Sequence, residues 1–430
     1  MNLSPKERLR VWLGSDASSA ARILRSVISI LVGDAAAEAV NTVVISRQAL
    51  VLGPANFGAL SAAQAFVDPF RAVAAFGLTL VAVTVAARRK GPDGALVRTL
   101  FALYAALSLV ASTVAVAASY VAGRGGPTVL VASAAVSVFP VVALGAARLP
   151  AQYEQALHRL IALPLVIAIA RLGLVELAIR TSNTALAHQW ALNGAALFGL
   201  VATWLVIKRL YPLGDGGPSR EVARDLLRLA WPIAVLDVTV TIYLKAAYIL
   251  LEPYGPAAQG AYAAAERLAQ PITGISAAIV ASALPTVTRA AQSGDASELS
   301  RVYRQSILRA ALVLVPALSI AAAVAPWVIT RWAPQYTPAT RPFQALLVGG
   351  LFMFLNQLSS MFIVGIGRVT ALMVIAFANL AVYLALAIKL VPIYGATGSA
   401  IATTIMEAIN CVMQLALVRS LVRSRTIEPR

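Results

Sequence analysis

The stretch GPANFGALSAA at residues 53–63 returns later in the chain as GPAAQGAYAAA at residues 255–265. Seven of the eleven positions are identical without a gap, among them the Gly-Pro pair and the second glycine. An acidic residue precedes each copy at a similar distance: Asp34 lies 19 residues before the first copy and Asp237 lies 18 before the second. Because internal repeats reveal architecture, we interpret the chain as two related halves.

The sequence around these copies is strongly apolar. The chain has 430 residues, of which 60% are hydrophobic and only 12% charged, whereas soluble domains carry about a quarter charged residues. A spanning helix needs about 20 largely apolar residues, so the composition predicts an all-α integral membrane protein. Windows bounded by Pro, Gly and charges predict twelve transmembrane helices, at 27–47, 58–87, 97–121, 127–147, 160–180, 186–207, 229–251, 260–286, 308–330, 343–366, 369–391 and 396–418.

Lys and Arg are distributed unevenly between the predicted loops. If both termini are cytoplasmic, 25 of the 35 Lys and Arg residues fall in cytoplasmic segments and six on the opposite face. The positive-inside rule therefore predicts cytoplasmic termini for a multi-pass protein of the cell membrane. The net charge of +17 is then a topology signal next to anionic membrane lipid, and no nucleic-acid partner is expected.

Six spans in each half place corresponding loops on the same face. This pattern predicts two six-helix lobes related by a parallel repeat about an axis along the membrane normal, which is typical of transporters that bind substrate between their lobes. The expected organisation is a cytoplasmic N-terminal segment 1–26, an N-lobe 27–207, a cytoplasmic inter-lobe loop 208–228, a C-lobe 229–418 and a cytoplasmic tail 419–430.

Other classes of protein find little support in the sequence. One cysteine, Cys411, and two distant histidines, His158 and His188, offer no metal-ligand spacing, so we expect neither a metal nor a cofactor. The sequence has no Walker A, HExxH or GxSxG motif, and we expect no enzyme. The energy for transport would then come from an ion gradient, the membrane potential or the flux of substrate.

Polar and charged residues inside the predicted spans form stripes on single helix faces. Each ionisable side chain at this depth costs at least about 2.5–3.5 kcal/mol, so such residues mark functional sites by default. Helical spacing groups Asp34, Glu38 and Asn41; Gln64, Asp68 and Arg71; Asp237, Thr241, Lys245 and Tyr248; and Thr403, Glu407, Asn410 and Gln414. A purely structural ion pair between Asp68 and Arg71 is equally compatible with the spacing, and Arg171 and Glu176 are expected to face separate partners.

The region of the first repeat copy resembles a known family. Residues 47–63, with Leu52-Gly53-Pro54 and Phe57-Gly58, are similar to the first external loop of bacterial polysaccharide and oligosaccharide flippases. Residues 262–267, followed by Pro285 and a basic loop, are similar to the eighth span of that family. The superfamily also contains multidrug-and-toxin extrusion antiporters and peptidoglycan-precursor flippases, which usually carry two spans more than are predicted here.

The resemblance covers about residues 27–420 and implies a function. It implies a V-shaped alternating-access transporter that moves an undecaprenyl-diphosphate-linked oligosaccharide for surface polysaccharide biosynthesis, in contact with membrane lipid and polysaccharide assembly proteins. A cavity between the lobes would bind the diphosphate and the sugar, the first through charge-assisted hydrogen bonds. The expected substrate-binding residues are Arg71, Lys245, Arg267, Asn41, Gln64, Thr241 and Asn410, with Gln414 beside them.

Four carboxylates are candidates for coupling to H⁺ or Na⁺. Asp34 and Glu38 lie one helical turn apart, and two such groups repel each other when both are ionised, which favours binding of a proton or cation. Asp237 and Glu407 occupy the corresponding stripes of the second half.

Three alternatives remain open at the level of sequence. A cation-coupled multidrug antiporter of the same fold would use Asp34, Glu38 and Glu407 and would have fewer cavity cations. A membrane-bound glycan polymerase, ligase or prenyl-linked transferase usually places its catalytic groups in a large external loop, and the predicted external loops are short. A major-facilitator sugar carrier would need a charged signature between spans two and three that residues 87–94 do not provide.

Overall fold

The computed structural model describes residues 19–427 except residues 90, 123, 124, 155, 271–295, 366 and 367. Within these residues every regular element is a helix, and ten helical segments are long and apolar enough to cross a membrane. The first of them, Ala35–Arg88, has 54 residues, which is more than one crossing of a core about 30 Å thick requires. It makes two crossings, so eleven of the twelve predicted spans have a helical counterpart. The predicted span 260–286 lies partly outside the described residues, although residues 256–270 are helical.

The helices follow one another through short connections. The first group, called the N-lobe, contains α2 (Ser19–Ala75), α3 (Leu78–Arg88), α4 (Gly94–Val121), α5 (Gly125–Val136), α6 (Val138–Tyr153), the short η1 (Leu157–Leu160), α7 (Ala162–Thr181) and α8 (Ala185–Leu210). The chain continues through α9 (Arg220–Leu250) and η2 (Glu252–Tyr254). The second group contains residues 256–270, α11 (Ala296–Trp332), η3 (Pro334–Ala339), α12 (Thr340–Gly365), α13 (Val369–Tyr394) and α14 (Ala396–Ile427). We call this group the C-lobe, whereas the C-lobe expected from the sequence, residues 229–418, also includes most of α9.

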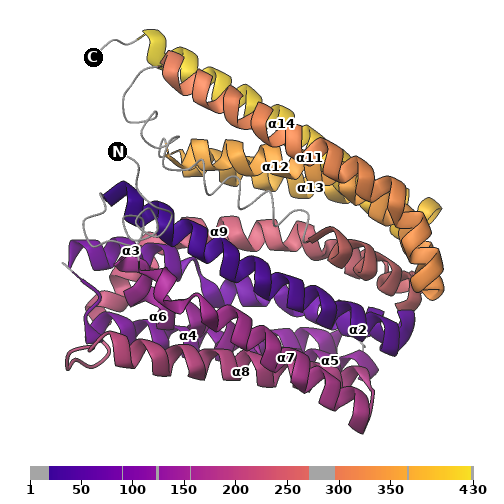
Figure 1. Ribbon diagram of the computed structural model, residues 1–430, viewed down its shortest axis with the longest axis horizontal. Helices are drawn as coiled ribbons and strands as arrows, with labels where there is room; N and C mark the ends of the chain where they lie inside the picture. Colours follow the sequence, from indigo (N-terminus) through magenta and orange to yellow (C-terminus); the bar gives the residue numbers. More distant parts are fainter. Residues whose placement is uncertain are drawn as a thin grey trace, which may run out of the picture.

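The two lobes lie on opposite sides of α9. Helix α9 packs against α2 in the N-lobe and against α13 in the C-lobe. Figure 1 shows the two helix groups close together at one end of the molecule and farther apart at the other, where α2 begins and α14 ends. We call the first of these the closed end. The V-shaped, all-helical arrangement expected from the sequence is therefore present.

The closed end is formed by the two copies of the sequence repeat. Gly53 has φ 69° and ψ 170°, and Gly255 has φ 86° and ψ 166°, so both copies reverse the chain through the same backbone conformation. Glycine adopts this left-handed region without a steric penalty, and the proline that follows suits the first position of the next helix. Because equal sequences have equal backbone angles, the copies are structural equivalents.

These two copies also pack against each other. A Cβ atom added to Gly58 would collide with the backbone of Pro256 and Gly260, and one added to Gly260 would collide with the backbone of Pro54. The contact is reciprocal, as expected when a two-fold pseudo-axis passes between equivalent segments. Glycines allow two helix backbones to approach this closely inside a membrane, where packing replaces the hydrophobic effect as the force between helices.

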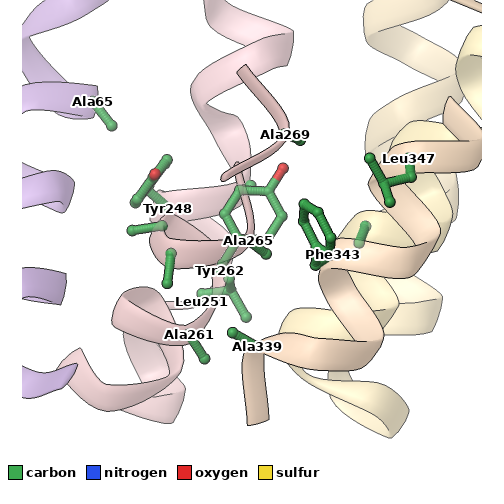
Figure 2. Packing of buried hydrophobic residues seen from close by; sticks show 14 of the residues in the cluster. Ala65, Tyr248, Leu251, Ala261, Tyr262, Ala265, Ala269, Ala339, Phe343 and Leu347 are labelled. Carbon is green, nitrogen blue, oxygen red and sulfur yellow. The ribbon is translucent and has the colours of Figure 1, made fainter. Parts of the chain in front are cut away.

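Buried apolar side chains form two large clusters. One joins the tip of α2 to the C-lobe and includes Tyr248, Tyr262 and Phe343. Figure 2 shows these aromatic rings between α9, the following helix and α12, and the rings of Tyr248 and Tyr262 meet edge to face with centroids 5.5 Å apart. The other cluster fills the N-lobe around α3, α4 and α6.

Helix α9 contributes to both clusters. Val222, Leu226 and Ala230 in its first half pack into the N-lobe cluster, whereas Tyr243 and Tyr248 in its second half pack into the other. Pro232 lies between these halves and removes one backbone hydrogen bond of the helix. The connection between the lobes therefore includes the continuous helix α9 in addition to the loop 211–219 before it.

The predicted inter-lobe loop 208–228 is mostly helical, which corrects the sequence interpretation. Within this range only residues 211–219 lack helical structure. Helix α9 then begins, with Ser219 as its cap accepting a hydrogen bond from the Val222 amide. This segment is bound to the N-lobe: Arg98 donates to the Gly216 carbonyl, and the Ser219 amide donates to Thr99 Oγ1 at 2.9 Å. Helices α2 and α14 extend into the predicted terminal segments, since α2 begins at Ser19 and α14 ends at Ile427.

The fourth predicted span is broken near its middle. Helix α5 ends at Val136 and α6 begins at Val138. Pro140 accounts for this break, because its ring nitrogen cannot donate a hydrogen bond to the Val136 carbonyl. Ser112 of α4 donates to the carbonyl of Ala135 at 3.0 Å and so satisfies one acceptor near the break. The break places Ser137 beside the polar interior of the molecule.

Candidate functional site

A polar cavity lies between the N-lobe and the segment Lys245–Gln270. It consists of two adjoining pockets of about 570 and 580 Å³ that share Asp68, Arg71, Arg148 and Lys245. Together the pockets are lined by five cationic side chains, Arg71, Arg148, Arg171, Lys245 and Arg267, and by two carboxylates, Glu38 and Asp68. The excess of cations makes this cavity suitable for an anionic ligand.

Two of the cations have carboxylate partners. Arg71 forms an ion pair with Asp68 on the next turn of α2, and its other nitrogen donates to Ser137 Oγ at 3.2 Å. Lys245 Nζ lies 2.7 Å from Glu266 Oε1 and 4.0 Å from Asp68 Oδ2. The structural ion pair that the spacing of Asp68 and Arg71 allowed is therefore formed. It does not remove Arg71 from the cavity wall.

Two other cations have neutral partners. Arg171 donates to Asn41 Oδ1 at 3.2 Å, and Arg267 donates to Gln64 Oε1 at 3.2 Å and to Gln270 Oε1 at 3.5 Å. Among the described residues, neither guanidinium has a carboxylate within ion-pair distance. Amide oxygens orient these groups without cancelling their charge, so Arg171 and Arg267 contribute positive potential to the cavity.

Arg171 and Glu176 face separate partners, as their spacing on α7 predicted. Glu176 accepts two hydrogen bonds from Arg47 at 2.8 and 3.2 Å, outside the cavity. The Arg47 side chain is 47% exposed, so this pair is close to the surface and stabilises the fold only weakly.

The predicted site residues of the N-lobe and of α9 are mostly brought together. Glu38, Asn41, Gln64, Arg71, Lys245 and Arg267 line the second pocket, and Thr241 lines the first. Asp237, also on α9, has an exposed side chain and lines neither pocket. The side chain of Asp34 lies outside the described part of the structure.

The residues predicted on α14 lie elsewhere, which corrects the single-cavity interpretation. Glu407 is 2% exposed and accepts from Asn356 Nδ2 at 2.6 Å and from Asn410 Nδ2 at 3.3 Å. Gln414 donates to Asn410 Oδ1 at 2.9 Å and accepts from Ser360 at 3.0 Å. This stripe faces α12 because α12 and α14 pack closely along their lengths. Asn356 and Ser360 of α12 supply hydrogen-bond partners for the polar groups of this stripe.

Several cavity residues were missed or undervalued in the sequence. Arg148 was assigned to a cytoplasmic loop, yet it shares a helical face with Val141 and Leu144, which also line the cavity. This i, i+3, i+7 spacing is the signal that would have found it. Gln189 and Asn193 on α8 carry no charge and gave no signal, although they bond to the cavity wall through Gln64. Among the described residues, no group of three or more His, Cys, Asp or Glu side chains is placed to hold a metal ion.

The fold and this cavity define a class: a multi-pass membrane protein with the architecture of a two-lobe transporter. A family model described as polysaccharide biosynthesis protein matches residues 23–291. The chain therefore belongs to the polysaccharide biosynthesis protein family, as its sequence motifs suggested.

Solved structures support the fold. An inward-facing multidrug-resistance MATE family transporter of the MOP superfamily is similar with a TM-score of 0.67 and 15% identity, over 90% of this chain and 100% of the other. An outward-facing structure of such a transporter has a TM-score of 0.67 and 16% identity, over 96% and 100%. A MOP superfamily transporter from Pyrococcus furiosus has a TM-score of 0.67 and 15% identity, over 96% and 100%. None of the curated proteins compared with the chain matched it.

Proposed function

We propose that the protein is a flippase that moves a lipid-linked oligosaccharide, carried on undecaprenyl diphosphate, across the cytoplasmic membrane. Transport would occur by alternating access, with both termini in the cytoplasm, and would supply surface polysaccharide biosynthesis. The observation that carries this proposal is the cation excess of the cavity in a chain of the polysaccharide biosynthesis protein family. Membrane lipid and polysaccharide assembly proteins would be its partners.

The chemistry of the cavity suits both parts of such a headgroup. A diphosphate would accept charge-assisted hydrogen bonds from Arg171 and Arg267, whose charges are not cancelled by a carboxylate. Sugar hydroxyl groups both donate and accept, which matches the amide of Asn41 and the hydroxyl of Thr241. The lipid chain would remain in the bilayer beside the lobes.

Two features support alternating access. The lobes meet at the closed end through the reciprocal contacts at Gly58 and Gly260 and through the apolar cluster that joins the tip of α2 to the C-lobe. This is the contact that would have to open in the opposite conformation. In addition, the fold is shared by relatives described in both inward-facing and outward-facing conformations. Helix α9 would carry the change from one lobe to the other, since it packs into both.

Coupling to H⁺ or Na⁺ would use the acidic residues. Glu38 lines the cavity together with Arg171 and is the proposed site there for a proton or cation. Glu407 is buried among amides in the C-lobe and would bind a proton there. Asp34 and Asp237 complete the proposed set from their positions on α2 and α9.

A cation-coupled multidrug antiporter of the same fold is the second candidate. The similarity to multidrug transporters favours it, but only at the level of the fold. A cavity with five cations and two carboxylates would repel the positively charged compounds that cation-coupled drug export handles best. The relative from Pyrococcus furiosus is described as having a binding pocket of reversed polarity that suggests a different function. The same line of reasoning favours an anionic substrate here.

The deciding experiment is the analysis of lipid-linked oligosaccharide in a strain that lacks the protein. We expect the glycan lipid to accumulate on the cytoplasmic face, and the wild-type protein to reverse this. The double variant Arg171→Gln Arg267→Gln should fail to reverse it, whereas Arg331→Gln, which changes an exposed arginine at the closed end, should succeed. Unchanged glycan lipid combined with new drug sensitivity would refute the proposal and favour the antiporter.

A further inference from the structure

A chain of three amide side chains leads from the cavity into the N-lobe. Arg267 donates to Gln64 Oε1 at 3.2 Å, and Gln64 Nε2 donates to Gln189 Oε1 at 3.0 Å. Gln189 Nε2 donates to Asn193 Oδ1 at 2.9 Å, and Asn193 Nδ2 donates to the backbone carbonyl of Ser133 at 2.8 Å. We call this series the amide relay. It connects α8 and α5 with the cavity wall.

The relay can point in only one direction. The Ser133 carbonyl is an acceptor, so Asn193 must turn its NH₂ group toward it and its oxygen toward Gln189. Gln189 must then turn its NH₂ group toward Asn193 and its oxygen toward Gln64. Gln64 therefore turns its oxygen toward the cavity. A guanidinium group only donates, so Arg267 at the other end requires the same orientation. Gln189 and Asn193 are 2% and 5% exposed, and water therefore competes little for these bonds.

The direction of the relay has an electrostatic consequence. It presents an oxygen to Arg267 that carries no full negative charge, and the guanidinium is fixed without being neutralised. Lys245 shows the other outcome, since Glu266 holds it at 2.7 Å and compensates its charge. A buried polar network whose members are all satisfied is rigid and specifies one geometry.

We propose that Gln189 and Asn193 are positioning residues that aim Arg267 into the cavity, as a cation held by amides and by no direct ion pair among the described residues, for the anionic group of the substrate. They touch no ligand themselves and act through Gln64. The inference rests on the proposed function in one respect, namely that the ligand carries a diphosphate or a similar anion. It adds the residues that prepare the site for it.

The test compares binding of inorganic diphosphate and thermal stability for the purified full-length protein and its variants. In Gln64→Glu the new carboxylate would pair with Arg267, so we expect diphosphate affinity to fall about ten-fold or more. The new ion pair offsets the bond that position 64 can no longer donate to Gln189, so the melting temperature should not fall. If the residue served only the fold, affinity would fall together with the melting temperature, and a loss of affinity without a loss of melting temperature would not be seen.

A pair of variants at Asn193 isolates the relay. Asn193→Asp still accepts from Gln189, and in its protonated form it also donates to Ser133, so the relay keeps its direction and affinity should stay within about two-fold of wild type. Asn193→Leu removes both bonds, and affinity should fall about five-fold or more. Asn379→Leu replaces a buried amide of α13 outside the cavity and is the control for stability loss alone.

The possible failures are distinct. If the wild-type protein binds no diphosphate, the anionic ligand of the proposed function is wrong and the inference falls with it. If the wild-type protein binds diphosphate but Gln64→Glu and Asn193→Leu bind it equally well, or if Asn379→Leu loses as much affinity as Asn193→Leu, the positioning role is wrong while the proposed function stands.

Discussion

The contact between Gly58 and Gly260 makes a sharp prediction about the closed end. In Gly58→Ala the new Cβ would lie 2.6 Å from the Gly260 amide nitrogen and closer still to the Pro256 carbonyl, whereas ordinary van der Waals contact begins at 3.4 Å. All of the opposing atoms belong to the backbone and cannot rotate away. The two segments must therefore separate by about 1 Å, and forced contacts of this kind cost about 1–3 kcal/mol.

This cost arises only in conformations in which the two repeat copies are in contact at the closed end. An equilibrium between closed and open forms would shift toward the open form by about 5- to 150-fold, since about 1.4 kcal/mol corresponds to a factor of ten. Gly260→Ala should act in the same way through Pro54. The double variant should shift the equilibrium by less than the two single effects combined, because either methyl group already separates the same surfaces.

The distribution of distances across the closed end is the direct measurement. Spin labels at Ser182→Cys in the N-lobe and Trp332→Cys in the C-lobe, both exposed positions, would report it by electron double resonance. The only native cysteine, Cys411, is buried at 5% exposure and should label slowly. We expect Gly58→Ala to enrich the longer distances and to reduce transport.

A control separates this effect from the general consequence of adding a methyl group. Gly173 lies inside α7, and a Cβ built there meets nothing within 4 Å. Gly173→Ala should leave the distances unchanged and stabilise the protein by about 0.5–1 kcal/mol through helix propensity. Equal distance distributions for Gly58→Ala, Gly173→Ala and wild type would refute the account of the closed end.

Three further predictions concern charges and a helix cap. Glu407→Gln keeps the shape of the buried network but cannot exchange a proton, so it should abolish any dependence of transport on a pH gradient while leaving diphosphate binding intact; a full pH response in this variant would contradict the coupling role. Lys245→Met removes the ion-pair partner of Glu266 and leaves it, among the described residues, only the hydrogen bond from Tyr248, which should lower the stability by about 3–5 kcal/mol; Lys245→Met with Glu266→Gln should recover most of the melting temperature. Burial alone would raise the pKa of Asp93, but bonds from Arg89 and from the Leu96 amide outweigh it and lower that pKa; the cap therefore stabilises α4 above the pKa of the unfolded carboxyl and weakens as the pH falls through the folded value. Asp93→Ala should lower the free energy of unfolding by about 1 kcal/mol at neutral pH, whereas Asp93→Asn should change it little. Thermal unfolding at pH 7 and at pH 3 is the measurement, and an equal effect of Asp93→Ala at both pH values would contradict the role of the cap.

The sequence alone determined the class and the large-scale plan. Apolar length specifies spanning helices wherever lipid is the solvent, because every backbone polar group there must be satisfied within its own segment. The repeated Gly-Pro blocks determined the equivalence of the halves, since only glycine adopts the backbone angles of Gly53 and Gly255 at no cost. Helical spacing correctly grouped Gln64 with Arg71 and Thr241 with Lys245, because one turn fixes which residues share a face.

Tertiary structure decided which of these faces meet. The stripe of Glu407 and Asn410 has the same spacing as the others, yet it lies within the C-lobe because α12 offers Asn356 as a partner. Residues 208–228 are rich in turn-forming and charged residues, but packing of Val222 and Leu226 into the N-lobe makes the latter part of this segment helical.

The charge balance of the cavity also depended on the tertiary structure. Among the described residues, Arg171 and Arg267 have amides in place of direct ion-pair partners, because folding gave them these neighbours from helices distant in sequence. A linear pattern records which residues lie along one helix. It does not record which neighbour another helix brings to them, and in this protein that neighbour determines whether a buried charge is cancelled or kept available for a ligand.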